Sequence, residues 1–129
     1  MVRKIFLGMM CCLLAGSLSA AQKQLSLTSP DGTLKATINV GEKLTYSVLY
    51  DGKEVLAPSA ISMTLDNGEV WGDNAKLLKS AEKQIDTKIA SPFYRADSMR
   101  DWCNELTLKF KGDYSVVFRA YNDGIAYRF

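Results

Sequence analysis

The sequence contains no histidine, three cysteines and three prolines in 129 residues. The lack of histidine removes the usual zinc-binding side chains and the base of a serine–histidine–aspartate triad. Two of the cysteines, Cys11 and Cys12, lie in an apolar N-terminal stretch, which leaves Cys103 alone in the rest of the chain. One thiol cannot form an internal disulfide. With no histidine to activate it, we interpret Cys103 as a small buried apolar residue.

Residues 1–21 have the three parts of a secretory signal peptide. Two basic residues precede an apolar run over residues 5–15, and small residues follow the run. The run is shorter than the roughly 20 residues that a membrane-spanning helix needs. We expect cleavage after Ala21, with cleavage after Ala20 as the near competitor, and export to the periplasm or the medium. A buried N-terminal helix is the alternative for this segment.

Removal of the signal peptide leaves a chain without net charge. Arg3 and Lys4 leave with it, so the 16 basic residues become 14, against 14 acidic residues. The remaining charges are interspersed, as on a solvated surface. No basic field remains to attract nucleic acid or anionic lipid, so we expect no nucleic-acid partner. We also expect no membrane span after cleavage.

Alternation of apolar and polar residues dominates the mature part of the chain, residues 22–129. It is clearest in residues 33–40, 44–50, 105–111 and 114–121. Glycine pairs that suit tight hairpins lie between apolar runs: Asp31-Gly32, Asp51-Gly52, Asn67-Gly68, Gly112-Asp113 and Asp123-Gly124. With no long 3.6-residue period, this pattern predicts an all-β fold, an antiparallel β-sandwich, without a second domain boundary.

One stretch, from about residue 81 to 104, is less regular. We expect a strand from about Gln84 to Ala90 and then a longer connection, which carries Phe93, Tyr94, Arg95, Arg100 and Trp102. Aromatic and arginine side chains on a loop can form a sugar-stacking or partner surface. Alternatively, the loop folds back and its aromatic rings close the end of the sandwich, which is the packing role that we favour.

Trp71 lies in a short segment, residues 66–74, that is rich in Asp, Asn and Gly. It is either an exposed platform on a hairpin or a half-buried strand residue, and we favour the second interpretation. The segment lacks the twelve-residue pattern and the closing glutamate of a calcium loop. Trp71 therefore joins Phe93, Tyr94, Arg95 and Trp102 as a possible carbohydrate or domain-interface contact.

The acidic residues give no clear catalytic pattern. Most lie beside glycine in turns, where their carboxylates hydrogen-bond the turn backbone. Asp97 and Asp101 could be an acid–base pair, but we interpret them as a solvated pair on the loop. We therefore assign no catalytic, cofactor-binding or metal-binding residue in this chain.

Three blocks of the sequence together resemble the N-terminal domain of glycoside hydrolase family 97, the family of α-glucosidase and α-galactosidase type. They are SPDG at residues 29–32, YDGK at residues 50–53 and FRAYNDGIAYRF at residues 118–129. The similarity extends from about Leu25 to Phe129. It implies a large, supersandwich-like β-sandwich, of which this chain is an incomplete, truncated part, because Phe129 interrupts a strand.

The resemblance also implies a role. In full-length members a (β/α)8 barrel holds the catalytic carboxylates and a calcium ion, and the N-terminal domain packs on it. We expect this chain to act as a scaffold and as part of the wall of the pocket that binds an α-linked oligosaccharide. We expect it to have no activity or cofactor of its own. A stand-alone carbohydrate-binding or interaction module and a non-functional remnant are the alternatives.

Overall fold

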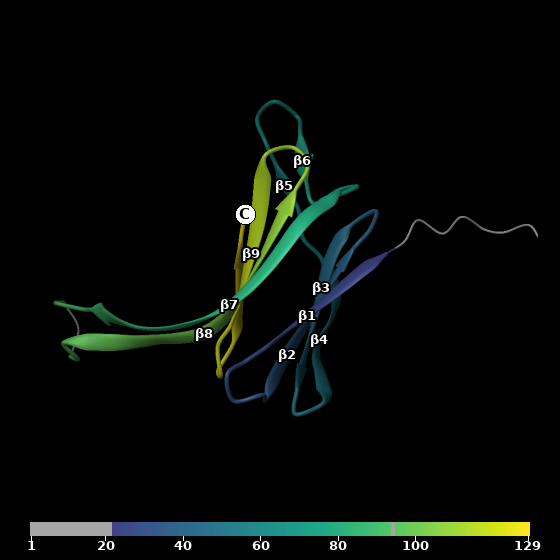
Figure 1. Cartoon of the computed structure of the whole chain (residues 1–129). Coiled ribbons are helices and arrows are strands. Elements are labelled where there is room, and N and C mark those ends of the chain that lie inside the picture. The colour runs from purple at the N-terminus through teal and green to yellow at the C-terminus, as the bar shows by residue number, and fades with distance from the viewer. Residues whose placement is uncertain (1–21, 94) are drawn as a thin grey trace, which may run out of the picture.

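The computed structural model describes residues 22–93 and 95–129 (Figure 1). The expected signal peptide and its cleavage site, and Tyr94, lie outside the described residues. The described residues form strands and turns and no helix, so they offer no helix that could cross a membrane. The prediction of an antiparallel all-β fold is confirmed.

Two four-stranded antiparallel sheets make up the sandwich. Sheet I has the order β1 (Lys23–Thr28), β2 (Leu34–Val40), β3 (Leu44–Tyr50), β4 (Lys53–Ala60). Sheet II has the order β10 (Ile125–Arg128), β9 (Tyr114–Ala120), β8 (Ser98–Phe110), β7 (Leu77–Ala90). A small hairpin of β5 (Met63–Thr64) and β6 (Val70–Trp71) connects them. The five predicted turns are present, and four have their glycine at positive φ.

The core is the apolar seam between the two sheets. In β2 and in β9 every second residue is buried, as the alternation predicted. β1 lies opposite β8 and β9, and β2 lies opposite β9. The side chains with almost no exposure come from both sheets: Leu27, Ala36, Ile38 and Leu44 from sheet I, and Leu108, Phe110, Val116, Phe118 and Ala120 from sheet II.

A row of aromatic rings joins the sheets near β10. Tyr46 of sheet I lies 5.9 Å from Phe118 and 5.5 Å from Tyr127, measured between ring centroids. Tyr127 also lies 5.8 Å from Phe118. Such tilted and edge-on pairs stabilise beyond their buried area. The row gives the short strand β10 an anchor in the core, although Tyr127 itself remains exposed.

The β7–β8 hairpin is longer than predicted. β7 begins at Leu77 rather than near Gln84, and β8 begins at Ser98. Arg100 and Trp102 therefore lie on a strand, and their placement on a loop is wrong. The stretch is poor in apolar residues, so alternation gave no signal there, but the backbone pairs continuously from Ala90 and Ser98 inward. The far part of this hairpin projects from the sandwich (Figure 1).

Gly72 lets the β5–β6 hairpin approach the main chain of sheet I. Its carbonyl oxygen accepts a hydrogen bond from Leu44 N at 2.8 Å, and its N–H donates to Tyr114 Oη at 3.3 Å. The residue has a φ of +100°, and a Cβ here would lie 2.5 Å from the carbonyl oxygen of Ile61. A side chain at this position would therefore force the two segments apart.

We expect Gly72→Ala to destabilise the fold more than Gly68→Ala. Gly68 has a similar φ of +83°, but nothing lies within 4 Å of the position that its Cβ would take. Gly68→Ala should show the conformational cost alone, about 1–2 kcal/mol. Gly72→Ala should cost about 1–3 kcal/mol more because of the clash. Denaturant unfolding measures both, and equal losses of stability would contradict the close approach at Gly72.

Candidate functional site

The residues predicted as carbohydrate or interface contacts lie in two separate places. Trp71 is in β6, whereas Phe93, Arg95 and Trp102 belong to the β7–β8 hairpin. Figure 1 shows the β5–β6 hairpin and the tip of the β7–β8 hairpin at different ends of the molecule. Tyr94 is not among the residues that the structure describes. These residues therefore do not form one site.

Of the predicted contact residues, Trp71 packs against the fold, whereas Phe93 is exposed to solvent. Trp71 is a half-buried strand residue, as predicted, and its ring stacks on Tyr114 at 4.8 Å with the planes 5° apart. Its Nε1 donates a hydrogen bond to Glu69 Oε1 at 3.3 Å. Phe93 is 97% exposed, so the interpretation that the loop aromatics close the sandwich is wrong for this residue. The physical reason is the length of the hairpin, which carries Phe93 beyond the sandwich.

Arg100 binds side chains on one face of the hairpin. Its Nε and Nη2 donate to Asp86 Oδ1 and Oδ2 at 2.7 and 2.8 Å, a bidentate ion pair across the two strands. The hydrogen bond from Arg100 lowers the pKa of Asp86. The guanidinium also lies 4.3 Å from the ring centroid of Trp102. One face of the Trp102 ring is therefore already occupied by a cation.

A polar network lies on the outer face of sheet II. Glu105 of β8 is only 6% exposed, although it faces away from the core. Its Oε2 accepts a hydrogen bond from Arg119 Nε of β9 at 2.7 Å, and its Oε1 lies 3.2 Å from Lys83 Nζ of β7. The carboxylate is thus held by cations from both neighbouring strands.

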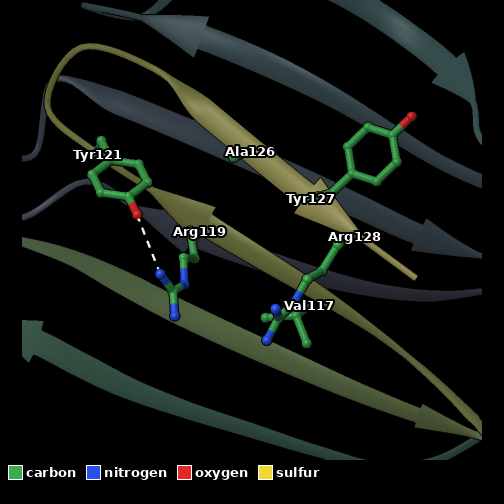
Figure 2. Close-up of a pocket in the computed structure, with 6 residues that line it drawn as sticks. All are labelled: Val117, Arg119, Tyr121, Ala126, Tyr127 and Arg128. Carbon is green, nitrogen blue, oxygen red and sulfur yellow. Dashed lines mark hydrogen bonds between the residues drawn. The ribbon is translucent and has the colours of Figure 1, made fainter. Parts of the chain in front are cut away.

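The network continues to Asp101 and Tyr121. Arg119 Nη1 lies 3.4 Å from Asp101 Oδ2 and from Tyr121 Oη, and Tyr121 Oη donates to Asp101 Oδ1 at 3.0 Å. Figure 2 shows the contact between Tyr121 and Arg119. The side chain of Asp101 is largely buried on β8, so its interpretation as one of a solvated loop pair with Asp97 is wrong. Cys103 is fully buried, as predicted.

The electrostatics of the network are those of a fixed ion-pair cluster. Burial alone would raise the pKa of Glu105, but the hydrogen bonds from Arg119 and Lys83 outweigh it and hold the pKa below its usual value. Burial is the main cause that raises the pKa of Tyr121 and of Cys103. Near neutral pH Glu105 is therefore ionised and Cys103 is a thiol. Neither is prepared to act as a general acid or as a thiolate nucleophile.

An open pocket of about 210 Å³ lies beside the network (Figure 2). It lies between β9 and β10 and is lined by Val117, Arg119, Tyr121, Ala126, Tyr127 and Arg128. Ligand pockets for small molecules usually measure about 300–1,000 Å³ and enclose their ligand. The pocket in Figure 2 is smaller than this, and apolar side chains and two arginines line it, of which Arg119 is already paired with Glu105 and Asp101.

The pairing register of β8 and β9 brings the residues of the polar network together, and the sequence contained a signal for this register. A hairpin turn at residues 111–113 pairs Phe110 with Tyr114, and the same register places Glu105 opposite Arg119. Opposite charges directly across two strands attract each other. Because Glu105 and Arg119 occupy polar positions of the alternation, the sequence reasoning treated them as solvated and missed their contact.

Two of the blocks that carry the family resemblance meet in the structure. Asp31 N donates a hydrogen bond to Asn122 Oδ1 at 3.1 Å, which joins the SPDG turn to the last block. Within the first turn, Ser29 Oγ donates to Asp31 Oδ1 at 2.6 Å, and Thr33 N donates to the same oxygen at 3.0 Å. These residues therefore fix turns and hold neighbouring segments together.

The described residues hold no cluster of three or more carboxylate or thiol side chains that could bind a metal ion. This part of the chain therefore offers no fit for the calcium ion that the resemblance places at the catalytic site of full-length members. We assign no calcium ligand to the chain.

A comparison with protein families identifies the chain. The model of the family "Glycosyl-hydrolase 97 N-terminal" matches residues 27–129. The chain belongs to this family. A relative, the retaining alpha-galactosidase of Bacteroides thetaiotaomicron, is 56% identical over 128 residues, which are 99% of this chain and 19% of the relative. The chain therefore spans about a fifth of the length of this curated relative.

Solved structures of two enzymes share the fold. A glycoside hydrolase family 97 enzyme from Pseudoalteromonas sp. strain K8, in complex with panose, superposes with a TM-score of 0.69 at 24% identity. The match covers 80% of this chain and 17% of that enzyme. A beta-arabinopyranosidase matches with a TM-score of 0.71 at 26% identity, over 81% of this chain and 18% of that protein. Both matches cover less than a fifth of the solved protein, so the chain shares its fold with one part of each of these longer proteins.

We expect Glu105→Gln to destabilise this family 97 domain near neutral pH and not in acid. Because its folded pKa lies below the usual 4.5, Glu105 stabilises the fold above that pH, and the contribution is lost as the pH falls through the folded pKa. The variant should lose about 1–3 kcal/mol at neutral pH, since it weakens charged hydrogen bonds. Urea unfolding at neutral pH and near pH 3 measures the loss at each pH.

Asp86→Asn is the matched control, because it breaks an exposed ion pair on the same sheet. Exposed pairs contribute little, so its effect should be clearly smaller. A Glu105→Gln variant that is as stable as the parent at neutral pH, or equally destabilised at both pH values, would contradict the role of the network.

Proposed function

We propose that this chain is the N-terminal β-sandwich part of an exported α-glycosidase, in which a separate catalytic barrel domain hydrolyses α-galactosidic or α-glucosidic bonds. The chain acts as a scaffold and as part of the wall of the carbohydrate pocket. The observation that carries this proposal is the similarity at 56% identity, over almost the whole chain, to a fifth of a retaining alpha-galactosidase. Calcium and the catalytic carboxylates belong, in this proposal, to the part of the enzyme outside this chain.

The chemistry of the described residues supports a structural role. The buried carboxylates, Glu105 and Asp101, are bound by Arg119 in ion pairs. Because its hydrogen bonds hold the pKa of Glu105 below the usual value, Glu105 is not the protonated acid that glycoside hydrolysis requires. The polar groups in the turns of the family blocks are likewise engaged in hydrogen bonds within the fold, such as the bond from Asp31 N to Asn122 Oδ1.

A stand-alone carbohydrate-binding module has less support. Such modules stack sugars on free aromatic faces, but Trp71 stacks on Tyr114 and the guanidinium of Arg100 covers one face of Trp102. Among the described aromatic candidates, Phe93 alone is almost fully exposed. The outer face of sheet II instead carries an open pocket, lined by Arg128 of β10 and by the ion-paired Arg119 of β9. In this proposal the outer face of sheet II contacts a second domain. Through that contact the sandwich supports the walls of the carbohydrate pocket.

A chimeric enzyme tests the proposal. The full chain, with its own residues 1–21, would replace the matching segment of the Bacteroides thetaiotaomicron enzyme. We expect the periplasmic fraction to hydrolyse an α-galactoside, and mass spectrometry to show a mature N-terminus at Gln22. The rest of the enzyme without any such segment should be at least about tenfold less active, because the pocket is no longer positioned. The chain alone should be inactive.

Each part of the proposal has an outcome that contradicts it. If the enzyme without the segment is as active and as stable as the chimera, the chain is not a scaffold. A chimera that keeps Met1 and stays in the cytoplasm would contradict export. Hydrolysis by the chain alone would show that the catalytic groups lie within it.

A further inference from the structure

The turn of the β5–β6 hairpin contains an asparagine that is followed by glycine. Asn67 is the only one of the five asparagines in the sequence with a glycine after it. Residues 66–69 are all exposed to solvent. Two main-chain hydrogen bonds close the turn, from Leu65 N to Glu69 O at 2.8 Å and from Gly68 N to Leu65 O at 2.9 Å. The Asn-Gly pair is therefore both exposed and held in a defined turn.

The side chain of Asn67 folds forward over the peptide unit of Gly68. Its Oδ1 accepts a hydrogen bond from Glu69 N, two residues further on, at 2.9 Å. An asparagine bonded in this way forms an Asx turn. The ring of atoms that this hydrogen bond closes contains both the carboxamide carbon, Asn67 Cγ, and the main-chain nitrogen of Gly68. The turn therefore holds an electrophilic carbon beside a nitrogen that could attack it.

The same hydrogen bond would favour the attack. Addition of Gly68 N to Asn67 Cγ moves negative charge onto Oδ1, and a donor already directed at that oxygen stabilises the developing oxyanion. Gly68 has no side chain to obstruct the approach, and nothing lies within 4 Å of the position that its Cβ would take. The bond from Gly68 N to Leu65 O opposes the reaction and must open first. Hydrogen bonds in exposed turns open by local fluctuation.

We propose that Asn67 is a site of spontaneous modification, at which the turn converts its own asparagine into isoaspartate or aspartate. Gly68 N forms a bond to Asn67 Cγ, and the bond from Cγ to the side-chain nitrogen breaks. That nitrogen leaves as ammonia with the proton that Gly68 gives up, and a five-membered succinimide remains. Water then opens the ring at the main-chain carbonyl carbon, which gives isoaspartate, or at Cγ, which gives aspartate. This chemistry does not depend on the proposed function.

Other turns of the chain provide internal comparisons. Asp31 also precedes a glycine, and its Oδ1 accepts a hydrogen bond from Thr33 N at 3.0 Å. Its side chain is a carboxylate, which is a poor electrophile and has no ammonia to release. Asn74 is an exposed asparagine, but the residue after it is Ala75, whose Cβ stands beside the attacking nitrogen. Only Asn67 combines a carboxamide, a following glycine and a donor on Oδ1.

The modification would alter the hairpin where its pairing is shortest. β5 and β6 pair only through Met63 with Trp71 and Thr64 with Val70. Isoaspartate adds a further carbon atom to the main chain inside the turn, so the turn can no longer keep the hydrogen bonds that close it. Gly72, which follows β6, bonds to Leu44 of sheet I. The change would therefore loosen the attachment of the hairpin to the sandwich.

Ageing of the full chain tests the site. The folded chain is kept in mildly alkaline buffer at physiological temperature, and peptides are sampled over time by mass spectrometry. We expect Asn67 to lose its amide at least about tenfold faster than Asn74, because only glycine leaves the attacking nitrogen unobstructed. Electron-transfer fragmentation, which separates the two products of equal mass, should show isoaspartate as the main product. For the same reason Gly68→Ala should slow the loss at least about tenfold.

The results that would overturn the proposal are distinct. An Asn67 that keeps its amide in the folded chain overturns it, and loss of the amide only in urea would assign the protection to the fold. Equal rates at Asn67 and Asn74 would remove the role of the glycine. Aspartate without isoaspartate would show direct hydrolysis by water. Because Gly68→Ala also strains the turn, the product of the parent chain decides this last point without the variant.

Discussion

The apolar seam between the two sheets is the constraint on which the rest of the structure depends. Ile38 and Leu44 from sheet I and Leu108 and Phe118 from sheet II have almost no exposed surface. Side chains alternate along a strand, so burying these residues directs their neighbours outward. Arg119 lies outward because Phe118 and Ala120 lie inward, and Glu105 lies outward because Leu106 lies inward. The position of the polar network is therefore a consequence of the core.

The seam also leaves surfaces that the described residues do not cover. β4 and β10 are at the edges of their sheets, and β4 is exposed along most of its length. The far part of the β7–β8 hairpin has apolar side chains in solvent, and the pocket beside β10 is open. An open strand edge can pair with further chain. These surfaces agree with the proposal that the domain works as part of a longer glycosidase.

The sequence predicted those features of the fold that local residue patterns determine. Alternation gave the sandwich and its core strands, and the glycine pairs gave the turns. Alternation did not give the length of the β7–β8 hairpin, because this ribbon is held mainly by backbone pairing, and its polar side chains, such as Asp86 and Arg100, leave no apolar period. It also missed the burial of Asp101 and Glu105. Their partners lie 14–22 residues away in the chain, and only the strand register brings them together. The half-buried strand position of Trp71 was predicted correctly because Trp71 belongs to β6, a strand of a short local hairpin.

The central claim is that the seam forms the stable part of this domain and that the rest of the enzyme completes its edges. Amide hydrogen exchange on residues 22–129 alone, and on the same residues within the chimeric enzyme, measures this claim directly. In residues 22–129 alone, β9 and the adjoining part of β8 should exchange slowly, whereas β10 should exchange fast. In the chimera, β10 should become protected. Equal protection of β10 and β9 in residues 22–129 alone, with no change in the chimera, would contradict the claim.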